Sequence, residues 1–296
     1  MRYAEHPPHP ALAPFVECFW QASDEDAAAS RPPERVLPDG CVEWIFHLGE
    51  RFRRWAPEGR WQTQPASFVV GEMTRHLVLQ SNGRVRTLGV RFRPGGAYPF
   101  LAHSLDALTD RAVPTEDLWG REGRWLESAV FEARNEKARR RILERFLLAR
   151  FSEGVESRPR LDAAVRLLLQ RRGRETVARL AENVGWTVRQ LEREFRRGVG
   201  LGPKALARIV RFQNALLLSG RHPARPWADL AAACGYADQA HLIRDFREFG
   251  GATPAEQKAG EGDLSKNFVA PDRLDVLLHP PLPDVAFLQD GLALRP

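Results

Sequence analysis

The segment GYADQAHLIRDFREFGGATP, Gly235–Pro254, describes one short helix that begins after a glycine turn and ends at a glycine-proline stop. Its apolar residues recur three or four positions apart, which is the spacing of a single helix face. That face carries Leu242, Phe246 and Phe249. Arg244 and Arg247 fall on the opposite face. The pattern predicts a helix that packs by one side and presents arginine on the other.

A related run occurs earlier in the chain, GWTVRQLEREFRRGVGLGP at Gly185–Pro203. The two runs align at an offset of 50 residues before the helix and 51 residues within and after it. The matched pairs are Leu180 with Leu230, Ala181 with Ala231, Gly185 with Gly235, Trp186 with Tyr236, Phe195 with Phe246, Gly200 with Gly251 and Pro203 with Pro254. Because a solenoid needs about three repeats or more, the repeat predicts a pair of related helical units.

Each unit meets the requirements of a helix-turn-helix. Ala181 and Ala231 are small enough for two helices to cross closely. Gly185 and Gly235 can adopt the positive φ that a sharp turn between helices needs. The residues expected to hold the second helices in place are Val188, Leu191 and Phe195 in the first copy, and Leu242, Phe246 and Phe249 in the second.

The segment between the two copies, PKALARIVRFQNALLL at Pro203–Leu218, predicts a long connecting helix. It starts with proline, which the first turn of a helix tolerates, and its apolar residues have helical spacing. A stiff connector would hold the two second helices at a fixed separation. Since successive major grooves on one face of DNA lie about 34 Å apart, one chain could read two adjacent grooves.

The outward faces of the two second helices are polar. At about 100° per residue they carry Arg189, Gln190, Arg193 and Arg197 in the first copy, and Ala240, His241, Arg244 and Arg247 in the second. Arginine and glutamine can bond two atoms of a base edge in the major groove. Outward charges on one isolated helix usually only face solvent, but two matching units favour nucleic acid.

Charge is distributed unevenly along the chain. Residues 158–258 hold 19 Lys and Arg against 10 Asp and Glu, a net charge of +9. The remainder holds 25 basic and 28 acidic residues, a net charge of −3, within a whole-chain charge of +6. A basic segment joined to a slightly acidic remainder predicts a polyanionic partner for that segment alone.

The N-terminal 114 residues are predicted to be β-rich. Short apolar runs alternate with turn residues, as in VEWIFHL after LPDG, then SFVVGEMT, HLVLQ and RTLGVRFRPGG. In the last run Leu88, Val90 and Phe92 alternate with Gly89, Arg91 and Arg93, which is the period of a half-buried strand. Several short strands of this kind predict a small sandwich or barrel.

From Thr115 the pattern becomes helical. EKARRRILERFLLARF spaces Ala138, Ile142, Phe146 and Ala149 three or four apart. SEGVESRPR, Ser152–Arg160, has the composition of a linker. The predicted class is α+β: a β-rich sandwich or barrel at 1–114, a helical linker or dimerisation segment at 115–157, an all-α tandem helix-turn-helix domain at 158–258, and an extended tail at 259–296 that packs back.

These motifs resemble the AraC/XylS family of bacterial transcription regulators, in which a long helix joins tandem helix-turn-helix units. The resemblance covers about Leu161 to Gln257 and rests on LAENVGW, LEREFRRGVGLGP, IVRFQNALLL, LAAACGY and FREFGGATP. It implies a sequence-specific transcription regulator that binds double-stranded DNA. RNA polymerase and a second copy of the chain are further candidate partners.

The resemblance also implies which residues read bases. They are Arg189, Glu192 and Arg193 in the first copy, and Gln239, Ala240, His241 and Arg244 in the second. The helix-face estimate adds Gln190, and it places Glu192 and Gln239 at the flank. Ala240 would make an apolar contact, such as with a thymine methyl group. The residues assigned to phosphate contacts or surface solvation are Arg196, Arg197, Arg208, Arg211 and Arg247.

The N-terminal part resembles, more loosely, a sensor domain of uncharacterised function found in some of these regulators. The matching text is RVLPDGCVEWIFHLG, VVGEMT, LGVRFRPGGAYPFL, LTDRAVPTEDLWG and DVAFLQD. A small-molecule effector is a candidate ligand, and the candidate lining residues are Trp20, Trp44, Phe46 and Phe92. The alternative is a domain that binds a protein partner instead of a small ligand.

No catalytic, cofactor or metal site is predicted. His47, His76 and His103 lack the close spacing of metal ligands. Cys41 has no nearby histidine that would activate its thiol. The three cysteines are scattered and odd in number, which favours free thiols in a reducing compartment. No apolar run approaches the roughly 18 residues of a membrane span, and a cytoplasmic location is expected.

Overall fold

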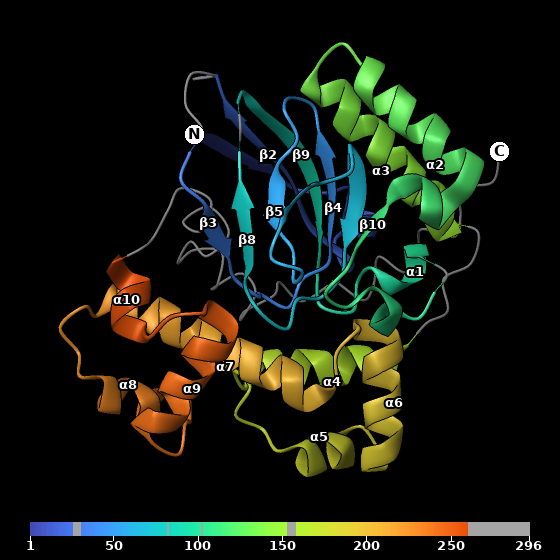
Figure 1. Cartoon of the computed structure of the whole chain (residues 1–296). Helices are drawn as coiled ribbons and strands as arrows, with labels where there is room; N and C mark the ends of the chain where they lie inside the picture. Colours follow the sequence, from blue (N-terminus) through green and yellow to red (C-terminus); the bar gives the residue numbers. More distant parts are fainter. Residues whose placement is uncertain (26–30, 82, 102, 153–157, 260–296) are drawn as a thin grey trace.

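The computed structural model describes residues 1–25, 31–81, 83–101, 103–152 and 158–259. Strands occupy the N-terminal part and helices the remainder (Figure 1). The predicted α+β class, a β-rich part followed by helices, is confirmed. Residues 153–157, within the predicted linker SEGVESRPR, and residues 260–296 of the predicted tail lie outside the described residues. Within the described ranges, no helix is both long enough and apolar enough to span a membrane.

The described strands form two antiparallel sheets. In order across the larger sheet, the strands are β1 (Arg2–His6), β2 (Val16–Asp24), β9 (Val85–Phe92), β4 (Glu43–His47), β7 (Ser67–Val70) and β10 (Ala112–Pro114). In the smaller sheet they are β3 (Glu34–Val36), β8 (Leu77–Gln80), β5 (Arg53–Trp55) and β6 (Trp61–Thr63).

Strand β9 has the predicted alternation, but both of its faces are buried. Leu88, Val90 and Phe92 belong to a large apolar core. Thr87 and Arg91 point the other way and line a cavity with residues of the smaller sheet. The expectation of a half-buried strand is therefore wrong, because β9 lies between β2 and β4 and a second sheet covers its other face. Arg91 is only 1% exposed.

Two helices cover the outer face of the larger sheet. Helices α2 (Thr115–Glu132) and α3 (Glu136–Ser152) lie side by side there (Figure 1). The predicted helix over residues 136–151 is confirmed, but its buried face is rotated from the predicted one. Leu143 and Leu147 are fully buried against the sheet, whereas Ala149 is exposed.

Three short helical turns complete the N-terminal part. They are η1 (Pro10–Leu12), α1 (Tyr98–Leu101) and η2 (Leu105–Leu108). The last of these contacts the C-terminal helices.

The C-terminal helices share one core around a long central helix. They are α4 (Pro159–Gln170), α5 (Val177–Asn183), α6 (Val188–Val199), α7 (Pro203–Arg221), α8 (Trp227–Cys234), α9 (Gln239–Gly250) and α10 (Pro254–Ala259). The predicted connector is confirmed as α7, whose 19 residues span about 28 Å. The pair α5–α6 lies toward one end of α7 and the pair α8–α9 toward the other (Figure 1).

The β-rich part rests on the helices through the loop between β3 and β4. Leu37 and Cys41 of this loop are buried in the core of the C-terminal helices. The Gln213 side-chain amide on α7 donates a hydrogen bond to the Pro38 carbonyl oxygen. Near the end of α6, the Thr109 hydroxyl donates to the Gly200 carbonyl oxygen at 2.7 Å. The β-rich part thus contacts both α6 and α7.

Candidate functional site

Both units adopt the predicted helix-turn-helix, with glycine at each turn. Gly185 has φ +66° and Gly235 has φ +78°, the left-handed region that glycine occupies at little cost. Each turn places a small residue of the first helix, Ala181 or Ala231, in the core. The second helices α6 and α9 are therefore held at a fixed angle to α5 and α8.

Helix α6 is fixed by its caps and by its buried face. The Thr187 hydroxyl accepts from the Gln190 backbone N–H at 3.2 Å, and the Gln190 side chain accepts from the Thr187 N–H at 2.9 Å. This capping box satisfies two donors that the helix cannot satisfy internally. Leu191 and Phe195 are fully buried. The helix therefore has one defined outward face.

That outward face carries fewer free base-reading groups than predicted. Arg189 and Arg193 are exposed, with the Arg193 side chain 71% exposed and paired to Glu194 at 3.0 Å. Glu192 is partly buried and lies 3.7 Å from Arg196. The side-chain oxygen of Gln190 already accepts from the cap, so its predicted role in base reading conflicts with its structural one.

Helix α9 is built in the same way. The Asp238 carboxylate caps it by accepting from the His241 backbone N–H at 2.6 Å. The predicted buried residues Leu242, Phe246 and Phe249 are all in the core. The predicted base-reading residues Gln239, Ala240 and Arg244 are exposed, and His241 is partly buried against Tyr236, with 5.2 Å between ring centroids.

The residues assigned to phosphates fall into two groups. Arg196, Arg197 and Arg247 are exposed, and Arg197 lies 5.7 Å from the Tyr98 ring. Arg208, in contrast, is held by Asp245 at 2.7 Å and by Glu248 at 2.5 Å. These hydrogen bonds to Glu248 and Asp245 raise the pKa of Arg208 above its ordinary value. Its contacts tie α7 to α9, so a phosphate contact by Arg208 would have to compete with these two carboxylates.

Two further placements differ from the sequence reasoning. Arg211 is partly buried, with its guanidinium 5.4 Å from the centre of the Tyr236 ring. Val188 was expected in the core but is 45% exposed at the first position of α6. An exposed valine at the start of a second helix can contact a thymine methyl group. In the sequence, the only signal of this exposure is that Val188 lies before the buried Leu191.

The N-terminal part contains a cavity of about 70 Å³ between the two sheets. Its walls are mainly apolar, and their larger side chains include Trp20, Ile45, Phe52, Phe68, Met73 and Leu79. The polar lining residues come from the larger sheet, from the loop after β3 and from the residue after β6, and they are Asp39, Glu43, His47, Gln64, Thr87 and Arg91. Small-molecule sites also combine apolar walls with a few placed polar groups, but their volumes are larger, about 300–1,000 Å³.

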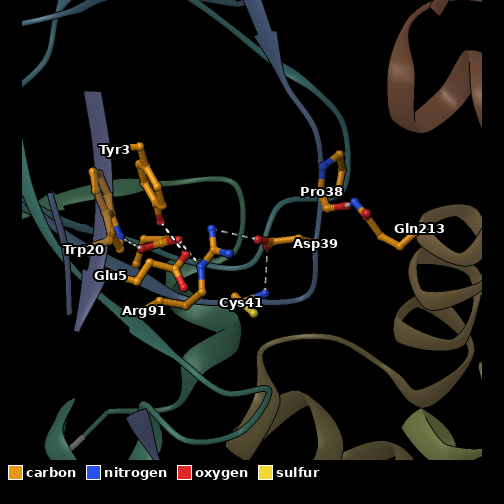
Figure 2. Close-up of polar contacts among 9 residues, drawn as sticks. Tyr3, Glu5, Trp20, Pro38, Asp39, Cys41, Arg91 and Gln213 are labelled. Atoms are coloured by element: carbon orange, nitrogen blue, oxygen red, sulfur yellow. Dashed lines mark hydrogen bonds and ion pairs between the residues drawn. The ribbon is translucent and has the colours of Figure 1, made fainter. Parts of the chain in front are cut away.

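Buried charged side chains form part of the cavity wall, and Figure 2 shows the contacts among them. The Arg91 guanidinium donates to Glu43 at 2.6 Å and lies 3.2 Å from Asp39. The Trp20 indole N–H donates to the second Glu43 oxygen at 2.7 Å. Burial alone would lower the pKa of Arg91, but Glu43 and Asp39 hold it well above its ordinary value. Burial raises the pKa of Glu43 to about 7, against the opposing effect of Arg91.

The same cluster reaches the loop that contacts α7. Asp39 accepts from the Cys41 backbone N–H at 3.1 Å, and the adjacent Pro38 carbonyl faces Gln213 (Figure 2). A continuous set of contacts therefore runs from the cavity through Asp39 and Pro38 to the middle of α7.

Only one of the predicted effector-binding residues lines the cavity. Trp20 does so, whereas Trp44, Phe46 and Phe92 belong to the core beneath α2 and α3. The last three point to the opposite face of the larger sheet, so they do not reach this cavity. The polar lining residues Arg91 and Thr87 were missed because β9 was expected to have one solvated face, and His47 was considered only as a metal ligand. All three cysteines are free and buried, as predicted.

Comparison with known proteins agrees with this geometry. Residues 180–259 match the family model of a helix-turn-helix domain, and residues 4–114 match a domain of unknown function, DUF6597. A Mycobacterium tuberculosis protein described as a probable bifunctional transcriptional activator/DNA repair enzyme AlkA is 41% identical over 75 residues. These residues are 25% of this chain, and the match spans only 14% of the length of that relative.

Two solved structures of ToxT from Vibrio cholerae are also similar. One has a TM-score of 0.45 and 10% identity, covering 82% of this chain and 99% of ToxT. The other, bound to an unsaturated fatty acid, has a TM-score of 0.39 and 10% identity, covering 80% and 92%. The chain thus contains a helix-turn-helix domain at residues 180–259, whose motifs resemble those of the AraC/XylS family, and an N-terminal domain of unknown function at residues 4–114.

Proposed function

We propose that the chain is a sequence-specific transcription regulator in which α6 and α9 read adjacent major grooves of one DNA duplex. The observation that carries this proposal is the arrangement of two capped second helices, each with exposed arginine, on either side of the single rod α7. A rod of about 28 Å is comparable to the groove spacing of about 34 Å. The net charge of +9 over residues 158–258 supplies the attraction to phosphates.

We further propose that the N-terminal part senses a small molecule and changes the position of the helices. The cavity and the contacts from Asp39 and Pro38 to Gln213 support this role. A ligand can shift the protein only as far as its affinities for two conformations differ. The wall residues Asp39 and Cys41 are the ones whose displacement would be felt at α7.

Replacing Arg193 or Arg244 by alanine is expected to cost roughly 1–3 kcal/mol of specific DNA binding. Each exposed guanidinium can bond two atoms of a guanine edge, and alanine cannot. A binding site selected from a random DNA library would supply the probe, with its single-base variants, for fluorescence anisotropy at fixed salt. Each variant should lose discrimination at one base position, and the two positions should lie in different half-sites.

Arg2→Ala is the matched control, because Arg2 is an exposed arginine on β1 of the N-terminal part. Its affinity and base preference should equal those of the parent protein. If Arg193→Ala weakens binding equally to all DNA sequences, then Arg193 contacts phosphate instead of a base.

The binding constant is expected to fall steeply with salt, because each phosphate contact releases condensed counterions. The slope of log K against log salt should be about −0.9 for each contact. Replacing the exposed Arg196 or Arg247 by alanine should reduce the magnitude of the slope by about one. A salt response that is flat, or unchanged in both variants, would contradict the proposed phosphate contacts.

A further inference from the structure

One loop of the β-rich part contacts the ends of both second helices. The loop is Gly71–His76, between β7 and β8. The C-caps of α6 and α9 are Gly200 and Gly251, which are matched glycines of the repeat. A Cβ atom at Gly251 would lie 2.2 Å from His76 Cε1. A Cβ atom at Gly200 would lie 3.3 Å from Glu72 Cγ. The same loop therefore lies against the corresponding point of each repeat.

The contact at α9 is made directly with the helix backbone. Two further atoms of the His76 ring, Nε2 and Nδ1, would lie 2.7 and 2.8 Å from a Cβ atom at Gly251. The imidazole thus occupies the space that any side chain would need there. Gly251 also has φ +67°, so both conformation and space favour glycine. Because no side chain stands between the ring and the backbone, the ring limits how far the end of α9 can move toward the loop.

The contact at α6 is buried. Glu72 is 0% exposed, and the Leu105 carbonyl oxygen would lie 3.1 Å from a Cβ atom at Gly200. The Thr109 hydroxyl donates to the Gly200 carbonyl oxygen at 2.7 Å. Two separate segments of the β-rich part therefore hold the C-cap of α6.

The loop is itself fastened at several points. The Asp110 carboxylate accepts from the Thr74 backbone N–H at 2.7 Å and from the Thr74 hydroxyl. The Asp110 backbone N–H donates to the Glu72 carbonyl oxygen at 2.8 Å. The Gly71 N–H donates to the Arg111 carbonyl oxygen at 3.0 Å. These hydrogen bonds make the loop a firm support for the two helix ends.

The loop is also short. Glu72 and His76 are four residues apart, so they can bridge at most about 14 Å even in a fully extended chain. Helix α9 reaches α7 through separate packing, with 5.0 Å between the Phe212 and Phe246 ring centroids. The second helices are therefore linked twice, once through α7 and once through the loop. Two attachments at different points resist a tilt of one helix against the other better than one attachment does.

Binding to two half-sites of DNA is sensitive to such a tilt. One inserted base pair moves the half-sites apart by about 3.4 Å and rotates them by roughly 35° about the duplex axis. We propose that Glu72 and His76 are positioning residues, which hold α6 and α9 at a fixed spacing through their C-caps and thereby set how many base pairs separate the half-sites. The inference deepens, and rests on, the proposed reading of adjacent major grooves.

Double electron–electron resonance of the full-length protein measures this spacing without DNA. Spin labels at Arg189→Cys and Ala240→Cys occupy matched, exposed positions on α6 and α9. The three native cysteines are buried, and protein without the introduced pair gives the labelling background. His76→Ala should broaden the distance distribution about twofold, because α9 loses one of its attachments. His9→Ala is the control, since His9 is exposed and its backbone N–H donates to Glu144 of α3.

Gly251→Ala tests the same contact from the helix side. Its Cβ atom would displace the His76 ring, so this variant should also broaden the distribution. Gly59→Ala is the matched control, because Gly59 has φ +74° and no atom lies within 4 Å of the Cβ that alanine would add. The double variant His76→Ala/Gly251→Ala should be no broader than the broader single variant, since both changes remove one contact. Additive broadening would contradict a shared contact.

Fluorescence anisotropy with DNA supplies the second readout. The selected site is compared with versions that have one base pair removed or inserted between the half-sites. The parent protein should prefer its own spacing at least about tenfold, because misplacing a half-site costs at least as much as one mismatched base pair. In His76→Ala the preference should fall below about threefold, while discrimination at the Arg193 base position is retained.

A distance distribution that His76→Ala and Gly251→Ala both leave unchanged would overturn the proposal and assign the spacing to α7 alone. A broadened distribution with an unchanged spacing preference would also overturn it, since DNA would then set the spacing. If the distribution broadens but selection yields no site with two half-sites, the loop still positions the helices and the proposed reading of adjacent grooves fails. The two proposals are therefore tested separately.

Discussion

Replacing Gly173 by alanine is expected to destabilise the C-terminal helices by about 3–5 kcal/mol. Gly173 follows α4 with φ +68°, a conformation that costs alanine about 1–2 kcal/mol. A Cβ atom here would also lie 2.1 Å from the Ala207 carbonyl oxygen, which belongs to the backbone of α7. Relief of that overlap requires the end of α4 to move away from α7 and opens their shared core.

Gly185→Ala provides the control for the backbone cost alone. Gly185 has a similar φ of +66°, but no atom lies within 4 Å of the Cβ that alanine would add. Its replacement should therefore cost only about 1–2 kcal/mol. Urea denaturation followed by far-ultraviolet circular dichroism measures both variants. Equal losses at the two positions would mean that contact with α7 contributes nothing at Gly173.

The second large effect is expected for Arg91→Met, which removes the only cation paired with Glu43 and Asp39 in the described cluster. Breaking a buried ion pair from one side typically costs about 3–5 kcal/mol, because the remaining charge stays buried without compensation. The loss should be smaller at pH 5 than at pH 8. Without Arg91 the pKa of Glu43 rises further above its unfolded value, so the stability of the variant falls as pH increases.

Arg84→Met is the matched control for Arg91. Arg84 is exposed and lies 3.5 Å from Glu25, whose side chain is also exposed. Surface ion pairs of this kind contribute little, so near-parent stability is expected at every pH. An Arg91→Met variant that unfolds at the same denaturant concentration as Arg84→Met would show that the buried cluster is dispensable.

The repeated units could be predicted from sequence because their signals are local. A glycine turn, a small residue and an apolar face at helical spacing all lie within about 20 residues in each copy. The positive φ of Gly185 and Gly235 and the burial of Phe195 and Phe246 are direct consequences of those signals.

The cavity could not be predicted in the same way, because it depends on which sheet covers which face. Alternation along β9 separates Phe92 from Arg91, but it does not say which side is solvated. Arg91 is accommodated only because Glu43 and Asp39 arrive from other segments of the chain. For the same reason the aromatic Trp44 was indistinguishable from Trp20 in sequence, although they lie on opposite faces.

The side chains of the recognition helices show a second limit. The Gln190 side chain has the hydrogen-bonding groups of a base-reading residue, yet its oxygen caps its own helix. The Arg208 guanidinium could contact a phosphate, yet it forms ion pairs with Asp245 and Glu248. A helix period assigns a side to each residue, but hydrogen-bond partners, in the same helix for Gln190 and in another helix for Arg208, decide which contacts that residue makes.

Gln213 is close to the midpoint of α7, which runs from 203 to 221. When a rigid helix is displaced at its centre, both of its ends move. If α6 and α9 read DNA as proposed, we expect a displacement of the Pro38 loop to shift both helices together and to release both halves of an operator at once. Regulation through this contact should behave as all-or-none occupancy of the whole site.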